Sequence, residues 1–133
     1  MRQFTKETIN YINLFESLTK AKVRDCFLNK ELTFIVEEGY IGKAIGKKGY
    51  NVFKMSRLTK KRIRVIEFND DIILFIKNLI SPVESKIYKE NNTIFIQPSN
   101  SIDKGIIIGR ERKNLKEINK ILSNYFNVDV KVV

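Results

Sequence analysis

The sequence contains no histidine and a single cysteine, Cys26, among its 133 residues. Zinc sites, cysteine–histidine nucleophile pairs and disulfide frameworks all need more of these residue types than the chain provides. Cys26 lies in a strand-like pattern, where a small buried thiol is much commoner than a reactive one. We therefore expect no metal site, no cofactor and no redox chemistry.

Long apolar runs are also missing from the sequence. No stretch reaches the roughly 18 consecutive apolar residues of a membrane span, and the first six residues, MRQFTK, lack the pattern of a signal peptide. Hydrophobic residues still make up 43% of the chain, which is enough for a packed core and disfavours disorder. We expect a folded, soluble, cytoplasmic protein that does not span a membrane.

Acidic residues are few, with 15 Asp and Glu against 25 Lys and Arg. The candidates for carboxylate catalysis or magnesium binding are two adjacent pairs, Glu37–Glu38 and Asp70–Asp71. A two-carboxylate site needs side chains that converge on one point, whereas adjacent residues at a strand end point to opposite faces. We interpret the pairs as turn and helix-start residues and predict that the protein is not an enzyme.

The excess of positive charge is concentrated in one segment of the chain. Residues 1–69 carry 15 basic and 7 acidic side chains, whereas residues 70–133 carry 10 and 8, and residues 43–64 hold nine basic residues and no acidic one. Such a segment indicates a polyanionic partner, either nucleic acid or an anionic membrane surface. A lysine-rich solvated face is the alternative, and composition alone leaves it open.

An internal repeat is the most informative feature of the sequence. The segment GKAIGKKGYNV, residues 42–52, aligns with GIIIGRERKNL, residues 105–115, at a constant offset of 63. Two glycines, an isoleucine and an asparagine coincide, and a basic residue follows the second glycine in both copies. The chain is therefore expected to contain two tandem copies of one fold.

The flanking sequence repeats as well. Apolar residues at helical spacing predict a helix over residues 5–19, and the apolar segments 22–28 and 32–36 predict two strands. In the second half, a helix from Asp70–Asp71 to Ser81–Pro82 precedes strands over 83–89 and 93–97. We predict an α+β fold with domains at 1–69 and 70–133, each ordered α-β-β-α-α-β and packed together as one rigid unit.

The segment Gly46–Gly49 is expected to form a Gly-x-x-Gly loop between two short helices. A loop of this kind ends one helix with positive φ and presents free backbone N–H groups at the start of the next, where an anion fits. Lys47 and Lys48 add full positive charges. Beside the loop we expect a groove that is wide enough for unstacked bases. Its lining is expected to be apolar and to consist of Ile41, Ala44, Ile45 and Val52.

A Gly-x-x-Gly loop within a helix-loop-helix, followed by a strand, resembles the KH RNA-binding domain, and the element order resembles its type II form. A pair of such domains of this size is similar to the archaeal NusA-like proteins. The resemblance implies that the chain binds single-stranded RNA and acts with RNA polymerase in transcription termination or antitermination. It implies RNA contacts at Gly46, Lys47, Lys48 and Gly49. Beyond the motif itself, we also expect RNA contacts at Lys43, Ile45, Arg57 and Arg64, with the two arginines extending a path for phosphates.

The second copy of the loop departs from the pattern. Arg112 stands where the fourth position should be glycine, so a Cβ enters a site of close approach and the residue is expected to adopt an unfavourable φ. Glu111 places a negative charge near the expected phosphate. Direct clamping by this copy stays open, with looser RNA contacts expected at Gly109, Arg110, Arg112 and Lys113.

Other residues beside the loops allow more than one interpretation. Asn51 and Asn114 are expected to be N-caps whose side chains accept a backbone N–H, in preference to direct recognition of a base. For Phe53 we favour packing in a core or interface over stacking on RNA, whereas for Tyr50 both possibilities stay open.

Two alternative functions remain for the whole chain. The first is a ribosome-associated or RNA-processing KH factor, and the second is an adaptor whose KH fold mainly binds protein, as the altered second loop suggests. The absence of acidic residues from segment 43–64 argues against the adaptor for the first half. The oligomeric state does not follow from the sequence, and a monomer is the expectation.

Overall fold

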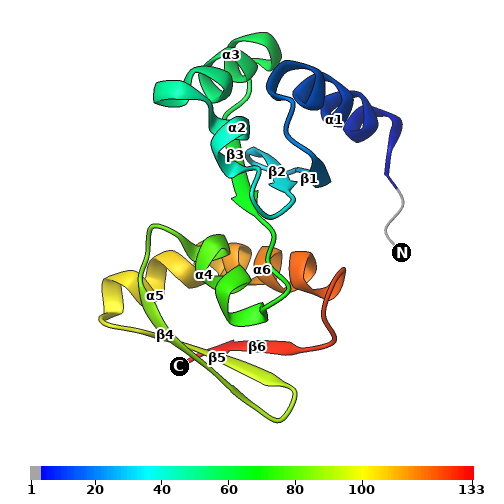
Figure 1. The fold of residues 1–133 in the computed structure, drawn as a ribbon. Coiled ribbons are helices and arrows are strands. Elements are labelled where there is room, and N and C mark those ends of the chain that lie inside the picture. Colours follow the sequence, from blue (N-terminus) through cyan, green and yellow to red (C-terminus); the bar gives the residue numbers. More distant parts are fainter. Residues whose placement is uncertain (1–3) are drawn as a thin grey trace. The chain divides into compact units, whose positions relative to one another are not determined.

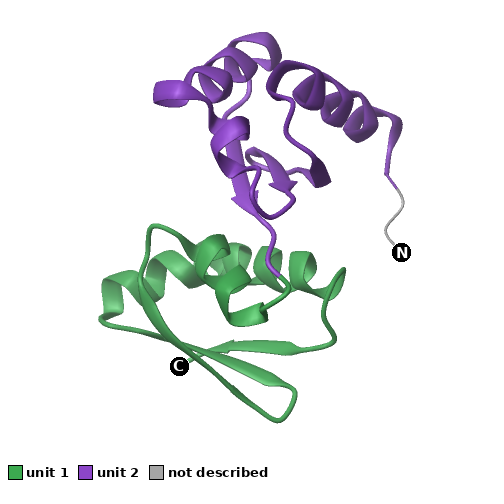
Figure 2. Cartoon of the chain, in the orientation of Figure 1, with its two compact units in different colours: residues 1–2, 70–133 green, residues 3–69 purple. Residues whose placement is uncertain are grey.

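A computed structural model describes residues 4–133 of the chain, which form two compact units (Figures 1 and 2). The first unit in chain order, purple and keyed as unit 2 in Figure 2, ends at Asn69, and the second, green and keyed as unit 1, begins at Asp70. Rigid packing of the two units against each other stays a prediction, and each is described here by itself.

The first unit is a three-stranded sheet with helices on it. Strands β1 (Val23–Leu28) and β2 (Leu32–Val36) are antiparallel, and β3 (Ile63–Glu67) is parallel to β2, which gives the order β1-β2-β3. The helices are α1 (Lys6–Thr19), the one-turn helix α2 (Ile41–Ile45) and α3 (Tyr50–Thr59), and the 3-10 turn η1 (Lys47–Gly49) connects the last two.

The second unit repeats this order of elements. Its strands are β4 (Ser85–Glu90), β5 (Thr93–Pro98) and β6 (Asp129–Val132), again with an antiparallel first pair and a parallel second pair. Its helices are α4 (Ile72–Ile80), α5 (Ser101–Ile108) and α6 (Lys113–Ser123), with the 3-10 turn η2 (Arg110–Arg112) between the last two. The predicted α+β fold of two similar modules is confirmed.

Helix ends follow from side-chain caps that the sequence displays. The Thr5 hydroxyl accepts a hydrogen bond from the N–H of Thr8, and the Asp71 carboxylate accepts one from Ile73, so each satisfies an N–H that has no partner within its helix. Asp71 is thus the helix-start residue that its position predicted.

The core of the first unit is built around the central strand β2, all five residues of which are buried. The rings of Phe15 from α1 and Phe34 from β2 are stacked with centroids 4.1 Å apart, and both are fully buried. Cys26 is fully buried in the same cluster, as its strand pattern predicted. In the second unit, β5 buries Ile94 and Ile96 completely. Because both cores lie on the sheets, the connections between the short helices are left at the surface.

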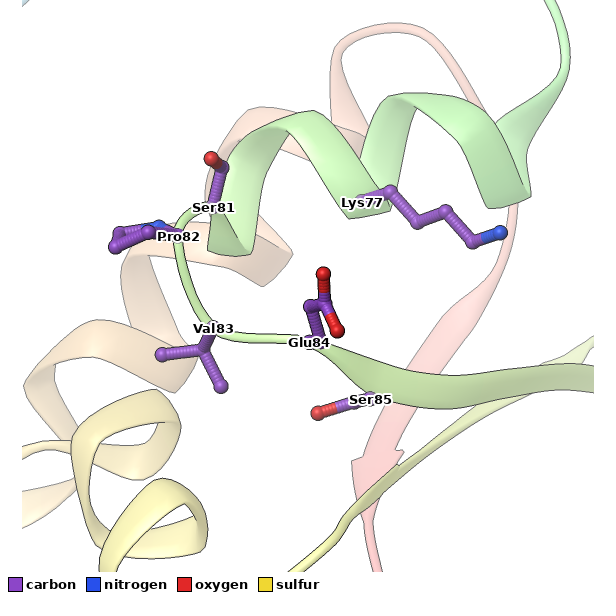
Figure 3. Close-up of a pocket in the computed structure, with 6 residues that line it drawn as sticks. All are labelled: Lys77, Ser81, Pro82, Val83, Glu84 and Ser85. Carbon is purple, nitrogen blue, oxygen red and sulfur yellow. The ribbon is translucent and has the colours of Figure 1, made fainter.

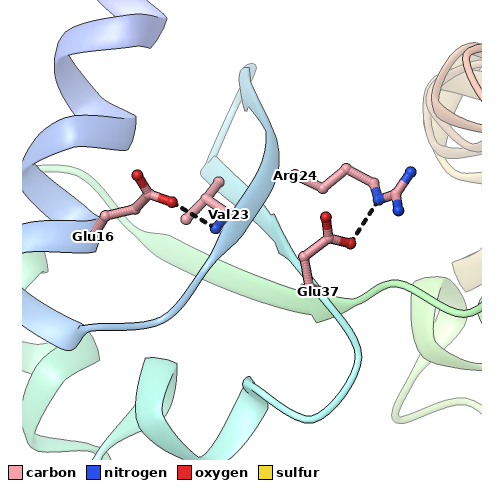
Figure 4. A network of polar contacts seen from close by, with 4 residues as sticks. All are labelled: Glu16, Val23, Arg24 and Glu37. Carbon is pink, nitrogen blue, oxygen red and sulfur yellow. Dashed lines mark hydrogen bonds and ion pairs between the residues drawn. The ribbon is translucent and has the colours of Figure 1, made fainter.

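Two carboxylates hold the strand β1 in place in Figure 4. Glu16 Oε2 of α1 accepts a hydrogen bond from the N–H of Val23 at 2.9 Å, and Glu37 Oε1 lies 2.8 Å from the Nε of Arg24. Glu37 therefore pairs with an arginine across the sheet, which agrees with its interpretation as a structural residue. Within residues 4–133, acidic and cysteine side chains do not gather into a group of three that could hold a metal ion.

We predict that Glu16→Ala lowers the free energy of unfolding by about 1–3 kcal/mol, because the Val23 N–H then loses a partly buried, charge-assisted hydrogen bond. Glu37→Gln should cost less than about 1 kcal/mol, since the side chains of its ion pair with Arg24 are 36% and 23% exposed and solvent screens the pair. Urea unfolding of both variants checks the ranking. Equal losses would contradict it.

None of the helices in the part of the chain that the structure describes is long and apolar enough to cross a membrane.

Candidate nucleic-acid interface

The first glycine loop leaves α2 and enters α3 within four residues. Gly46 has φ +79° and ψ 171°, a region that only glycine adopts readily, and Gly49 has φ +75° and ψ 16°, which is left-handed. The N–H of Gly49 donates to the carbonyl of Gly46 at 3.1 Å and closes the turn. The two lysines between them are therefore presented on a tight, defined turn.

The side chain of Asn51 stabilises this turn. Its Nδ2 donates to the carbonyl of Lys43 in α2 at 2.8 Å, and its side-chain atoms lie so close to Gly46 that a Cβ there would approach them to 2.8 Å. The expectation that Asn51 is an N-cap is wrong, because the N-cap of α3 is Gly49 and the Asn51 side chain donates rather than accepts. Asn51 instead ties the end of α2 to the start of α3.

The loop offers several hydrogen-bond donors and charges to a ligand. Among the described residues, the backbone N–H groups of Lys47 and Lys48 have no hydrogen-bond partner, and both side chains are exposed. The N-terminus of α3 adds its partial positive charge next to them. Free N–H groups, a helix N-terminus and two ammonium groups together are complementary to a phosphate.

A groove of about 610 Å³ lies beside the loop, between α3 and the edge strand β3. It brings together three of the predicted RNA contacts, Ile45, Gly49 and Arg64. The remaining lining residues include apolar side chains of α3 and β3, namely Val52, Phe53, Ile63 and Val65.

The predicted groove lining was right for Ile45 and Val52 and wrong for Ala44 and Ile41. Ala44 is fully buried in the core cluster of the first unit, and Ile41 packs against that cluster, because this face of the short helix α2 is turned to the sheet. Arg64 of β3 was predicted as an RNA contact, but the apolar contribution of this strand to the groove was missed. Its position at the edge of the sheet, which the sequence alone does not reveal, brings Ile63 and Val65 to the groove.

A second hollow at the loop, of about 440 Å³, is lined by Lys47, Lys48, Tyr50 and Phe53. For Phe53, the core position that we considered is wrong, because its side chain is 59% exposed, whereas packing in an interface stays a prediction. Tyr50 is 58% exposed. The guanidinium carbon of Arg57 lies 5.7 Å from the centroid of the Phe53 ring, within the range of a cation–π contact.

Apart from Gly46, which lies on the loop itself, the predicted contacts Lys43 and Arg57 line neither hollow. Lys43 is exposed on α2, and its Nζ lies 5.6 Å from the centroid of the Tyr40 ring. Arg57 lies one turn beyond Phe53 on α3 and is exposed. Both are placed to extend the positive surface around the loop rather than to form its centre.

The second loop has the same backbone as the first, although its fourth residue is not glycine. Gly109 has φ +75° and ψ 168°, Glu111 has φ +55°, and Arg112 has φ +62° and ψ 20°, so Arg112 adopts the unfavourable φ that was predicted. Asn114 donates to the carbonyl of Ile106 at 2.8 Å, as Asn51 does to Lys43, and the N-cap expectation is wrong for it too. The four predicted contacts of this unit, Gly109, Arg110, Arg112 and Lys113, thus lie on one turn.

A further hollow, of about 580 Å³, lies between the end of α4 and the start of β4 (Figure 3). Lys77 and Glu84 line it, and the buried hydroxyl of Ser85 has no hydrogen-bond partner among the described residues. None of the residues predicted to contact RNA lies there, so this hollow is separate from the candidate interface.

The glycine loop between two short helices, with a mixed sheet beneath it, is the arrangement expected of a KH domain. In agreement with it, the sequence matches the KH domain family over residues 10–85. This match covers more than half of the chain.

Similar proteins extend the likeness over almost the whole chain. A probable transcription termination protein NusA of Methanocaldococcus jannaschii is 33% identical over 98% of this chain and 75% of its own length. Another of the same name, from Halococcus morrhuae, is 28% identical over 91% of this chain and 90% of its own length. The crystal structure of APE1850 has 30% sequence identity and a TM-score of 0.75, covering 98% of this chain and all of that one.

The chain belongs to the archaeal NusA-like proteins, which carry KH domains. This family consists of non-enzymatic transcription factors, and the prediction that the protein is not an enzyme is confirmed on that ground.

Proposed function

We propose that the protein binds single-stranded RNA through the Gly46–Gly49 loop and acts with RNA polymerase in transcription termination or antitermination. The loop with its two free backbone N–H groups, flanked by Lys47 and Lys48 and opening on a groove, is the observation that carries the proposal. Relatives named as probable transcription termination proteins support the cellular role.

In this mechanism the loop holds the RNA backbone and the groove holds its bases. A phosphate accepts hydrogen bonds from the N–H groups of Lys47 and Lys48 and is neutralised by their ammonium groups. Unstacked bases enter the groove between α3 and β3 and contact aliphatic side chains such as Ile45 and Val52. Arg64 lies in the same groove, within reach of a base edge or the next phosphate.

Salt dependence of RNA binding tests the proposal. Fluorescence anisotropy of a short labelled single-stranded RNA, repeated at increasing salt, should show the logarithm of affinity falling by about 0.7 per phosphate contact for each unit of log salt. Duplex DNA of the same length should bind more weakly, because its bases cannot enter the groove. A flat salt dependence, or no binding at all, would contradict the mechanism.

Copurification from cells distinguishes the proposed action with RNA polymerase from the ribosome-associated alternative. RNA polymerase subunits should copurify with a tagged form of the protein. Loss of the subunits on nuclease treatment would mean that RNA links them to the protein, and their retention would mean direct contact. Recovery with ribosomal particles in place of polymerase would favour the ribosome-associated alternative.

The second loop is proposed to contact the same RNA more loosely, through Arg110, Arg112 and Lys113. On this basis we predict that Glu111→Lys raises RNA affinity roughly thirtyfold, since a repulsion of about 1 kcal/mol at contact distance in water is replaced by a similar attraction, a change of about 2 kcal/mol. Glu90→Lys, at the end of β4, makes the same change in net charge away from the loop and is the control. Equal effects of both variants would mean that this loop does not meet RNA.

A further inference from the structure

Two large aromatic side chains are left exposed on the outer face of α3, beside the glycine loop. Tyr50 is 58% and Phe53 59% exposed, and their separation of three residues places them on the same face of the helix. Single exposed apolar residues are normal on protein surfaces. Two aromatic rings side by side within a basic segment are a more specific feature, because they combine apolar area with nearby positive charge.

The rings and the two loop lysines line one hollow of about 440 Å³. Phe53 also lines the groove between α3 and β3, so its side chain is shared by the two hollows. Arg57 lies 5.7 Å from the centroid of the same ring and carries a further positive charge there. The hollow thus has flat apolar walls and cationic edges, which is the chemistry of a nucleotide site.

We propose that Phe53 and Tyr50 form a stacking site for an unpaired RNA base on the outer side of the Gly46–Gly49 loop. The inference rests on the proposed function and adds a second base-binding position to it. Stacking uses the face of a base, which every nucleobase has, so the site selects for single-stranded RNA without selecting a sequence. Lys47 and Lys48 lie at the same hollow and are placed to hold the phosphate of the stacked nucleotide.

The second unit shows that the aromatic pair is particular to the first. At the offset of 63, Lys113 and Lys116 stand in place of Tyr50 and Phe53 on the corresponding helix α6, and both are exposed. The corresponding face of α6 therefore carries positive charge but has no aromatic rings at these two positions. Base stacking is therefore assigned to the first unit alone, and the second unit is left with phosphate contacts.

Tryptophan fluorescence tests the site directly, because the chain has no tryptophan. Phe53→Trp should be quenched on addition of a short oligoadenylate, with a midpoint equal to that from anisotropy of the same oligonucleotide. Leu58→Trp is the matched control, since Leu58 is 56% exposed on the same helix and lines neither hollow. Polyphosphate, which has charge but no bases, should compete for binding without quenching Phe53→Trp.

Affinity gives a second readout. Phe53→Ala should weaken oligoadenylate binding about fivefold to a hundredfold, the range measured for the loss of one base–aromatic stack, whereas Leu58→Ala should leave it unchanged. Because both side chains are exposed, circular dichroism should show both variants folded. If Phe53→Trp binds the oligonucleotide without quenching, or Phe53→Ala binds as tightly as the wild type, the stacking site is wrong and the loop mechanism stands. If the wild type itself fails to bind, both proposals fail.

Discussion

Replacing Lys47 and Lys48 together by aspartate is expected to weaken RNA binding by more than about a hundredfold while the chain still folds. Each substitution turns an attraction of about 1 kcal/mol at contact distance in water into a similar repulsion, and two lysines flank the same proposed phosphate position. Both side chains are exposed on the turn, so the core does not depend on them. The slope of log affinity against log salt for any residual binding should become shallower by about 0.7, the share of the one phosphate that the two lysines hold.

The measurement is anisotropy of a labelled single-stranded RNA, with circular dichroism as the test of folding. A matched control is Lys86→Asp with Lys89→Asp on β4, which makes the same change in net charge with exposed residues of the other unit. If the control loses as much affinity as the loop variant, RNA responds to overall charge and the loop is not its binding site.

The two glycines of the loop should respond very differently to replacement by alanine. At Gly46, a Cβ would lie 2.8 Å from the Asn51 side chain, and φ +79° with ψ 171° is costly for any other residue. We expect Gly46→Ala to lower the free energy of unfolding by about 2–4 kcal/mol, from backbone strain of about 1–3 kcal/mol plus the steric clash. Urea unfolding followed by circular dichroism measures this loss.

At Gly49 the space is open and the conformation is left-handed, with no atom within 4 Å of a Cβ position. A left-handed alanine costs roughly 1–2 kcal/mol, and about 0.4–1 kcal/mol of this is offset because alanine restricts the unfolded chain. Gly49→Ala should therefore stay within about 1–2 kcal/mol of the wild type. The reverse ranking of the two glycines would contradict the geometry of the loop.

A double variant separates strain from clash at Gly46. Asn51→Ala removes the side chain that a Cβ would meet, along with the hydrogen bond to the Lys43 carbonyl. If part of the loss in Gly46→Ala comes from the clash, the loss on adding Gly46→Ala to Asn51→Ala should be smaller than on adding it to the wild type. Full additivity would assign the whole effect to the backbone conformation.

The difference between the two glycine positions explains why the second loop, residues 109–112, has the same backbone conformation as the first although its fourth residue is not glycine. Gly109 occupies the position where only glycine fits, with the Asn114 side chain 2.7 Å from a Cβ position. Arg112 occupies the left-handed position, which other residues adopt at modest cost. The sequence difference between the loops therefore falls where the backbone tolerates it.

Much of the fold was predictable because the signals lie within short stretches of sequence. Apolar residues at helical spacing predicted the helix over residues 5–19, and alternating or β-branched residues predicted the strands. The 63-residue offset predicted that the same order of elements occurs twice. Tertiary contacts do not overrule these signals. The location of the loop, with its lysines, followed from the same repeat. These elements needed no knowledge of which faces meet in space.

The errors concern the direction in which side chains point. Phe53 has the residue type of a core position, yet its side chain is 59% exposed, and Met55 is the buried residue of α3. Ala44 and Ile41 were expected in the groove and instead pack toward the core. The repeat showed that Asn51 and Asn114 stand at equivalent positions, and N-cap preferences suggested that they cap the helices. Each side chain instead donates a hydrogen bond to a carbonyl eight residues earlier, in the preceding helix. This bond depends on how the two helices meet in space, which N-cap preferences do not describe.

The matching dihedral angles of the two loops also bear on how such a protein can evolve. Gly109 and Asn114 hold the turn in shape although its outer residues differ from those of the first loop, so the tip can vary at only modest cost to the fold beneath it. New combinations at Arg110, Glu111 and Arg112 can be sampled on a backbone that stays the same. A duplicated module of this kind lets one copy retain an ancestral ligand while the other acquires a new one.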